Sequence, residues 1–302
     1  GSHSGGRCTC SASTSPAASR TDMGDLAADT EVQGASGRYF ATLSRDWEIW
    51  GPNGGYIASI ALRGAGVHTR MERPASIVGH FLGVASFDTP LQVDVTTLRS
   101  AKRAESMRVS LHQDENPIFE ALVWSVADVQ GLEHDFTSMP ERADPERIPT
   151  VAERLGDQIL QSPYHKFWSN FDERVPDEDW ISDWENRPPR DPVAGHWFRY
   201  VPTSTFDDPW VDACRSLILV DTMGWPAVCQ LHLDSGYMAP SIDIACGFHN
   251  TRPEEPWLWG QAISPSAANG LAGCEARVWS RDGALLAHGT SQLLFRPAPP
   301  RA

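Results

Sequence analysis

Residues 208–223 read DPWVDACRSLILVDTM, and the apolar residues of this stretch recur with helical spacing. Asp208 is a candidate N-cap, and Pro209 suits the first turn, where a backbone N–H is not needed. One face carries residues that step by three and four along the chain: Val211, Cys214, Ile218 and Asp221. The stretch therefore predicts a buried helix whose core-facing side includes the carboxylate of Asp221.

A carboxylate on such a face is costly unless it is hydrogen-bonded or paired. Asp221 is therefore a candidate catalytic group, although exposure or pairing with an arginine would explain it equally well. Two polar residues on strand patterns could accompany it, namely Ser241 within residues 239–245 and Gln292 within residues 290–295. Alternation puts Ser241 and Asp243 on one face of their strand, and each polar residue taken singly also suits a solvated face.

The elements around this helix recur twice along the chain. The first half has a strand pattern at 38–50, the break GPNGG at 51–55, and a helix from residue 56 to about 67 with Asn53 as N-cap. Four strands are expected after it, at 77–87, 91–99, 106–112 and 118–126. In the second half, the helix is expected to end at Gly224-Trp225-Pro226, with strands expected before and after it at 164–175, 195–201, 238–249, 257–264, 272–280 and 285–296. One long helix with antiparallel strands in each half predicts an α+β fold, in which each sheet buries one face on a helix.

Composition divides the chain into four expected segments. Residues 1–36 are rich in Gly, Ser, Ala and Thr and begin with the tag-like Gly1-Ser2-His3, so we interpret them as a disordered tail. The first repeat is expected at 37–130 and the second at 164–302. Residues 131–163 are acidic and contain prolines, which is typical of a linker, with one short helix near 151–159.

Charge and motifs exclude several classes of function. The formal net charge of −14 disfavours nucleic acid as a partner. The longest aliphatic run, 217–220, is far too short to span a membrane. The six cysteines form no cluster with histidines, so no metal site is expected, and reduced buried thiols favour a cytoplasmic location. The sequence contains no G-x-S-x-G nucleophile elbow, no H-E-x-x-H and no Walker A motif.

The C-terminal half, from about residue 215 to 296, resembles the acyl-CoA thioesterase II (TesB-like) family. The resemblance rests on the helix at 217–221, the strand at 241–249, the segment at 264–270 and the hairpin at 281–292. The first half is similar as well, through WGPNGGY at 50–56 and the strands around 98–108. This resemblance implies a double hotdog fold, with two repeats that each wrap an antiparallel sheet around a long central helix.

The resemblance also implies an active site and a reaction. The site residues implied are Asp221, Ser241 and Gln292, with Ser241 standing where the family usually has Thr. The implied function is hydrolysis of acyl-CoA to free acid and CoA, with Asp221 as general base for a water held by the other two. No cofactor is expected, because coenzyme A is part of the substrate. The first-half helix has Arg63-Gly64-Ala65-Gly66 where a carboxylate would align, so one working site per chain is expected.

Two further sets of residues are candidates for substrate contacts. Backbone N–H groups of Gly54, Gly55 and Tyr56, at a helix N-terminus, could bind the oxyanion, although a tight turn would need the same glycines. A basic stretch could meet the phosphates of CoA, although a solvated hairpin is the more ordinary interpretation of it: Arg99, Lys102, Arg103 and Arg108.

Alternative functions remain open on this fold. A non-catalytic acyl-CoA or lipid-binding protein would share the same architecture. A hotdog hydratase is disfavoured, because Phe119 stands where the hydratase signature has its histidine. Exposed sheet edges or faces lead us to expect a homo-oligomer.

Overall fold

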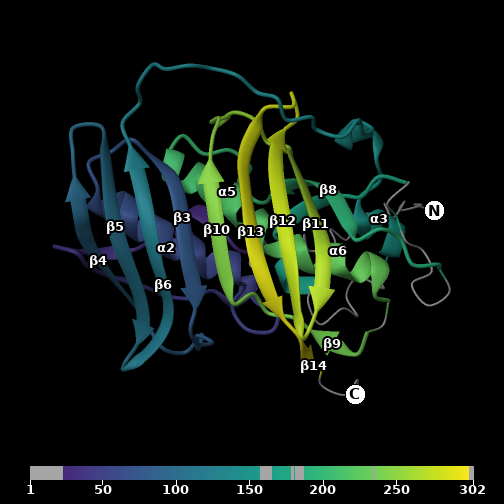
Figure 1. The fold of residues 1–302 in the computed structure, drawn as a ribbon, viewed down its shortest axis with the longest axis horizontal. Helices are drawn as coiled ribbons and strands as arrows, with labels where there is room; N and C mark the ends of the chain where they lie inside the picture. The colour runs from purple at the N-terminus through teal and green to yellow at the C-terminus, as the bar shows by residue number, and fades with distance from the viewer. Residues whose placement is uncertain (1–22, 157–164, 178–179, 181–186, 234, 299–302) are drawn as a thin grey trace, which may run out of the picture.

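The computed structural model describes residues 23–156, 165–177, 180, 187–233 and 235–298. Its main element is an antiparallel sheet of twelve strands, with the long helices packed on one side (Figure 1). The first half of the chain contributes β1 (Gln33–Ala35), β2 (Arg38–Ala41), β3 (Arg73–Phe81), β4 (Leu91–Ser100), β5 (Ala104–Gln113) and β6 (Asn116–Val126). The second half contributes β7 (Phe171–Arg174), β8 (Val193–Tyr200), β10 (Asp243–Phe248), β11 (Leu258–Ala268), β12 (Leu271–Ser280) and β13 (Leu285–Leu294). A separate pair is formed by β9 (Tyr237–Met238) and β14 (Arg296–Pro297).

The strand order shows how the two halves are joined. It is β1-β2-β4-β5-β6-β3-β10-β13-β12-β11-β8-β7, so each half supplies six neighbouring strands. The halves meet where β3 pairs antiparallel with β10, with Val78 opposite Ala245. The expected α+β double hotdog fold is confirmed.

The helices of the first half are α1 (Leu26–Asp29), η1 (Arg45–Trp47) and α2 (Gly54–His68). Between the halves and in the second half lie η2 (Pro145–Arg147), α3 (Val151–Leu155), α4 (His165–Trp168), α5 (Pro209–Thr222) and α6 (Gly224–Leu231). The caps of the two long helices are as expected: Asn53 accepts from Tyr56 N at 2.9 Å, and Asp208 accepts from Trp210 N at 2.8 Å.

The two long helices, α2 and α5, pack against each other in opposite directions. A Cβ on Gly55, at the start of α2, would lie 2.6 Å from Cα of Ile218 near the end of α5. A Cβ on Gly66, near the end of α2, would lie 2.7 Å from the indole of Trp210 at the start of α5. Glycine at these positions therefore permits the close approach of the helices, which brings the C-terminal end of α5 to the N-terminal end of α2.

The outer face of the second-half sheet is covered by the chain between the repeats. Four buried tryptophans form a cluster with Ile148: Trp197, Trp257, Trp259 and Trp279. Trp279 Nε1 donates to Thr137 Oγ1 at 3.2 Å, and Trp197 Nε1 donates to Ala143 O at 3.2 Å. Residues 137–148, which the sequence assigned to a linker, are therefore packed onto the sheet as part of the fold.

Several expected boundaries differ from the observed ones. Residues 1–22 lie outside the described residues, but α1 and β1 fall within the expected tail, and Leu26 and Val32 are buried in the core. The motif Gly224-Trp225-Pro226 starts α6 instead of ending the helical region, because proline is tolerated in a first turn. The expected helix at 151–159 is described only as α3. Residues 165–174 form α4 and β7, where one strand was expected.

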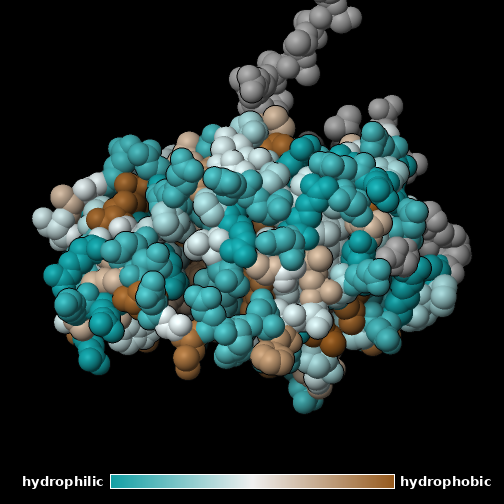
Figure 2. Space-filling model, turned by 90° about the horizontal axis from the view of Figure 1, so that it is seen from above, coloured by the Kyte–Doolittle hydropathy of each residue, from teal (hydrophilic) through white to brown (hydrophobic). Residues whose placement is uncertain are grey.

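One face of the molecule, seen from above, is predominantly polar (Figure 2). Figure 2 shows hydrophilic side chains over most of one face, with hydrophobic ones in small separate groups. No helix among the described residues is long and apolar enough to cross a membrane.

Candidate active site

A cavity of about 310 Å³ lies where the N-terminal end of α2 meets the C-terminal end of α5. Asn53, Gly54 and Ile57 line it from α2 and its cap, and Asp221 and Thr222 line it from α5. Most of the remaining lining is apolar: Ile49, Trp50, Phe81, Val84, Ile118, Trp168, Trp225 and Leu293. Asp221 is the one charged residue among the lining residues described.

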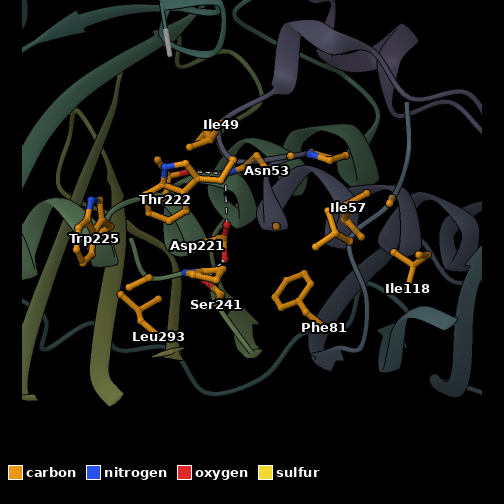
Figure 3. A pocket seen from close by; sticks show the side chains of 18 of the residues that line it. Ile49, Asn53, Ile57, Phe81, Ile118, Asp221, Thr222, Trp225, Ser241 and Leu293 are labelled. Atoms are coloured by element: carbon orange, nitrogen blue, oxygen red, sulfur yellow. Dashed lines mark hydrogen bonds between the residues drawn. The ribbon is translucent and has the colours of Figure 1, made fainter. Parts of the chain in front are cut away.

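Asp221 lies on the buried face of α5, as its helical spacing predicts, and only 7% of the residue is exposed. Its Oδ1 accepts a hydrogen bond from Ser241 Oγ at 2.8 Å. Its Oδ2 accepts from the backbone N–H of Gly55 at 2.8 Å and, at 3.4 Å, from Asn53 Nδ2 (Figure 3). The described residues provide no cation within ion-pair distance of it. Asp221 is therefore a buried carboxylate held by neutral donors beside a cavity.

Burial raises the pKa of Asp221 above its ordinary value of 3.8. The hydrogen bonds from Ser241 and Gly55 act against this shift, because both stabilise the ionised form. The positive end of the α2 dipole, which faces Oδ2, favours the ionised form as well. The carboxylate is thus more basic than an exposed aspartate, and its neutral donors favour the ionised form.

Ser241 reaches Asp221 from a short irregular segment. It forms a single bridge to Leu293 of β13, and regular pairing of β10 starts only at Asp243. Ile242 lies in a bend between them and is 36% exposed. The expected alternation is therefore interrupted here, because the bend turns Ser241 towards α5 independently of the strand that follows.

The structure does not bring Gln292 to this cavity. Gln292 is exposed, whereas its neighbour Leu293 is 1% exposed and lines the cavity. Successive side chains of a strand point to opposite faces, so Gln292 lies on the outer face of the sheet and its backbone N–H donates to Asp243. The inward neighbours on β13 are Ser291 and Leu293, and no pattern in the sequence singled out Ser291.

The three expected oxyanion donors have different roles. Gly55 N–H donates to Asp221, and Tyr56 N–H donates to Asn53 Oδ1. The Tyr56 side chain is buried, and its hydroxyl donates to Asp29 O at 2.8 Å. Only Gly54 N–H donates to no group among the described residues, and Gly54 lines the cavity. A Cβ there would lie 2.9 Å from Asp221 Oδ2, so glycine keeps this approach open.

The basic residues proposed for CoA lie far from the cavity. Arg70, which follows α2, donates to Ser100 Oγ at 3.2 Å, so the β4–β5 hairpin with Arg99, Lys102 and Arg103 is at the C-terminal end of α2. The cavity is at the N-terminal end, about 20 Å away for a helix of this length. Arg108 is exposed and pairs with Glu120 at 3.4 Å. Within one chain, these positions therefore favour a solvated hairpin over a binding site for the phosphates of CoA.

The other junction of the two helices is closed. There the indole of Trp210, which is buried, packs against Gly66. Arg63 Nη1, one turn earlier in α2, contacts the N-cap carboxylate Asp208 at 2.6 Å. The described part of α2 has no carboxylate at this end, and Trp210 with the Arg63–Asp208 pair fills the junction itself.

Comparison with known proteins gives family matches for both halves. Residues 140–295 match the acyl-CoA thioesterase C-terminal domain, and residues 43–126 match the acyl-CoA thioesterase N-terminal domain.

Solved structures give the same fold at low identity. The acyl-CoA thioesterase II TesB2 of Mycobacterium marinum is 20% identical with a TM-score of 0.71, over 91% of this chain and 99% of that one. A putative thioesterase II from Thermobifida fusca YX is 18% identical with a TM-score of 0.76, over 91% and 98%. A protein of unknown function with a hot dog fold from Alicyclobacillus acidocaldarius is 18% identical with a TM-score of 0.74, over 91% and 98%.

Proposed function

The chain belongs to the acyl-CoA thioesterase family and is a thioester hydrolase, and we propose that it hydrolyses acyl-CoA at the cavity beside Asp221. The observation that supports this site is a buried, unpaired carboxylate with a raised pKa, hydrogen-bonded to Ser241 and facing an apolar cavity. The substrate is acyl-CoA, and coenzyme A enters as part of it.

In the proposed reaction, Asp221 acts as general base on a water molecule. A carboxylate has about four acceptor positions, so the three donors on Asp221 leave one for the water proton. Ser241 donates to Oδ1, and its oxygen can accept the second hydrogen of the water. The water oxygen bonds to the thioester carbonyl carbon, the C–S bond breaks, and the proton on Asp221 passes to the leaving thiolate.

The carbonyl oxygen becomes an oxyanion during this attack and needs a hydrogen-bond donor. Gly54 N–H lines the cavity at the N-terminal end of α2, where the helix dipole also favours negative charge. We propose Gly54 for this role and assign Gly55 to the carboxylate instead. Gln292 takes no part in the proposed reaction, since its side chain is on the other face of the sheet.

The lining indicates the acyl groups that fit. Ile57, Phe81 and Ile118 lie to one side of Asp221, and Trp225 and Leu293 lie to the other (Figure 3). These apolar walls suit neutral hydrocarbon acyl groups. A second carboxylate on the acyl group would meet Asp221 and no cation among the described lining residues, so dicarboxylic acyl groups are disfavoured.

The test compares the wild type with Asp221→Asn on acyl-CoAs of graded chain length, with release of the free thiol as readout. We expect kcat to fall by about 10²–10⁴-fold while binding of acyl-CoA is kept. Gln292→Ala is the matched control and should keep wild-type activity. Equal activity in wild type and Asp221→Asn would overturn the proposed base. Binding without hydrolysis by the wild type would favour the non-catalytic alternative.

We also propose a cytoplasmic homo-oligomer. The cysteines described are all unpaired, which suits a reducing compartment. The outer face of the first-half sheet exposes Val78, Leu122 and Trp124 by 50%, 51% and 40%, whereas the corresponding face of the second half is covered by residues 137–148. A second copy of the chain could cover the exposed face. Light scattering would measure the oligomeric state of the wild type and of Leu122→Glu. A wild type that is monomeric, with a mass that Leu122→Glu leaves unchanged, would contradict the proposal.

A further inference from the structure

The hydroxyl of Ser291 on β13 has no explained role in the fold. The residue is 3% exposed, and its Oγ has no hydrogen-bond partner among the described residues. A buried hydroxyl without a partner costs about 1–3 kcal/mol, so such groups usually bind a water or serve a site. Alanine would avoid this cost, which makes serine at this position informative.

Its place in the sheet puts Ser291 beneath the turn of α5 that carries Asp221. A Cβ on Gly289, the inward residue before it, would lie 2.6 Å from Val220 Cγ1. A Cβ on Gly224 would lie 3.7 Å from Leu293 Cδ1, which belongs to the inward residue after it. Ser291 lies between these two contacts on the same face of β13, so it faces the turn between Val220 and Gly224.

The neighbouring strand supports this placement. Ser291 pairs across the sheet with Cys274, whose Sγ lies 3.6 Å from Gly224 O. Burial raises the pKa of the Cys274 thiol to about 11, and the negative charge of Asp221 adds to this shift. Cys274 therefore lies near Asp221 at the position of β12 that pairs with Ser291.

The second polar group of the site belongs to the same layer. Ser241 bridges to Leu293, two residues along β13 from Ser291, and donates to Asp221. Three side chains therefore lie in the region around the C-terminal end of α5, namely Asp221, Ser241 and Ser291.

We propose that Ser291 is a positioning residue that, through a bound water molecule, helps to hold the hydrolytic water against Asp221 and Ser241. A buried water needs two to four polar partners, and the Ser291 hydroxyl, the remaining lone pair of the Ser241 oxygen and the hydrolytic water can supply them. The inference rests on the proposed function, because it assigns Ser291 to the same reaction.

The first half provides an internal comparison. When the last hairpins of the two halves are laid over each other, Trp124 falls opposite Gln292, which places Val123 opposite Ser291. Val123 is fully buried on β6 and has no hydroxyl. At this position of the last hairpin, the hydroxyl is therefore found in the half that carries the carboxylate and not in the other half.

The test uses three substitutions at this position. Ser291→Ala removes the hydroxyl, Ser291→Val places the first-half residue there, and Ser291→Thr keeps a hydroxyl. We expect Ala and Val to lower kcat by about tenfold or more, which corresponds to one lost hydrogen bond to the water, with KM changed less than twofold. Thr should restore kcat to within about threefold of the wild type. Ser125→Ala, a buried serine on β6, is the matched control and should leave both constants unchanged.

A merely structural serine would give a different pattern. Thermal unfolding of Ser291→Ala should show no loss of stability, since the hydroxyl that is removed has no protein partner. Wild-type kcat in Ser291→Ala, or an equal loss in Ala and Thr variants, would overturn the inference. Asp221→Asn is measured beside them: if it loses activity while Ser291→Ala keeps it, only the role of Ser291 fails. If the wild type hydrolyses no acyl-CoA, the proposed function fails and this inference fails with it.

Discussion

Asp221 combines burial with three neutral donors, and this combination determines how its charge responds to pH. Burial is the largest influence and raises its pKa, whereas the donors from Ser241 and Gly55 lower it. Because the folded pKa lies above the ordinary value of 3.8, the ionised form costs folding free energy. The contribution of Asp221 to the free energy of unfolding is therefore fully present below pH 3.8. It is lost as the pH rises through the raised pKa of the folded state.

The raised pKa predicts the acid limb of the activity profile. The base must be ionised to accept a proton, so kcat/KM should rise with pH and level off above the folded pKa of Asp221. We expect a midpoint above 3.8, in the direction set by burial. Initial rates in constant-ionic-strength buffers measure this. A limb with its midpoint at or below 3.8 would contradict the assignment of Asp221 as a buried base.

Ser241 should affect both the position of that limb and its height. The hydrogen bond from Ser241 to Oδ1 lowers the pKa of Asp221. Ser241→Ala removes this bond, so the pKa should rise and the acid limb should move to higher pH. It also removes an acceptor for the water, and kcat on the plateau should fall by about tenfold. Ser241→Thr keeps the hydroxyl and should retain most of the activity. An unchanged limb in the alanine variant would show that the 2.8 Å hydrogen bond has no functional role.

At the scale of elements, the site depends on the close approach of α2 and α5. Gly55 both donates its N–H to Asp221 and allows the backbones to touch, since a Cβ there would lie 2.6 Å from Cα of Ile218. Backbone atoms cannot move aside as a flexible side chain can, so the helices would have to separate.

Gly55→Ala should therefore destabilise the fold and displace the carboxylate. We expect a loss of about 1–3 kcal/mol in the free energy of unfolding, the usual cost of overpacking. Activity should fall at temperatures where the variant is still folded, because the hydrogen bond to Asp221 depends on the same spacing. Denaturant unfolding measures the first effect. Gly131→Ala is the control, since a Cβ there would meet no atom within 4 Å. Wild-type stability in Gly55→Ala would show that the helices can separate freely.

Helix periodicity can be predicted from the sequence, whereas strand register and helix packing cannot. The spacing of 3.6 residues places Asp221 on the buried face of one helix, so helix periodicity alone suffices for it. Gln292 depends on the register of a strand, where one residue decides between cavity and outer face, and the sequence does not specify that register. The N–H of Gly55 is a free donor in an isolated helix. Its engagement with Asp221 appears only when the second helix is packed beside the first.

At the scale of the whole molecule, two similar halves form two helix junctions that differ from each other. Both halves place a helix on six strands, and the antiparallel packing of α2 and α5 creates two related junctions. Asp221 and a cavity of about 310 Å³ occupy one, and Trp210 packed on Gly66 fills the other. The first half thus contributes walls to the single site, through residues such as Ile57, Phe81 and Ile118.

This asymmetry predicts the binding stoichiometry. Asp221→Asn, which should bind acyl-CoA without turnover, allows calorimetric titration with an intact substrate. We expect one equivalent per chain, because opening the second junction would require the buried Trp210 to leave its packing at a cost of about 3–5 kcal/mol. Phe81→Trp should weaken this binding, since Phe81 lines the cavity, whereas Leu98→Ala on an exposed strand end should not. Two equivalents per chain would mean that the Trp210 junction opens for ligand and that both halves bind acyl-CoA.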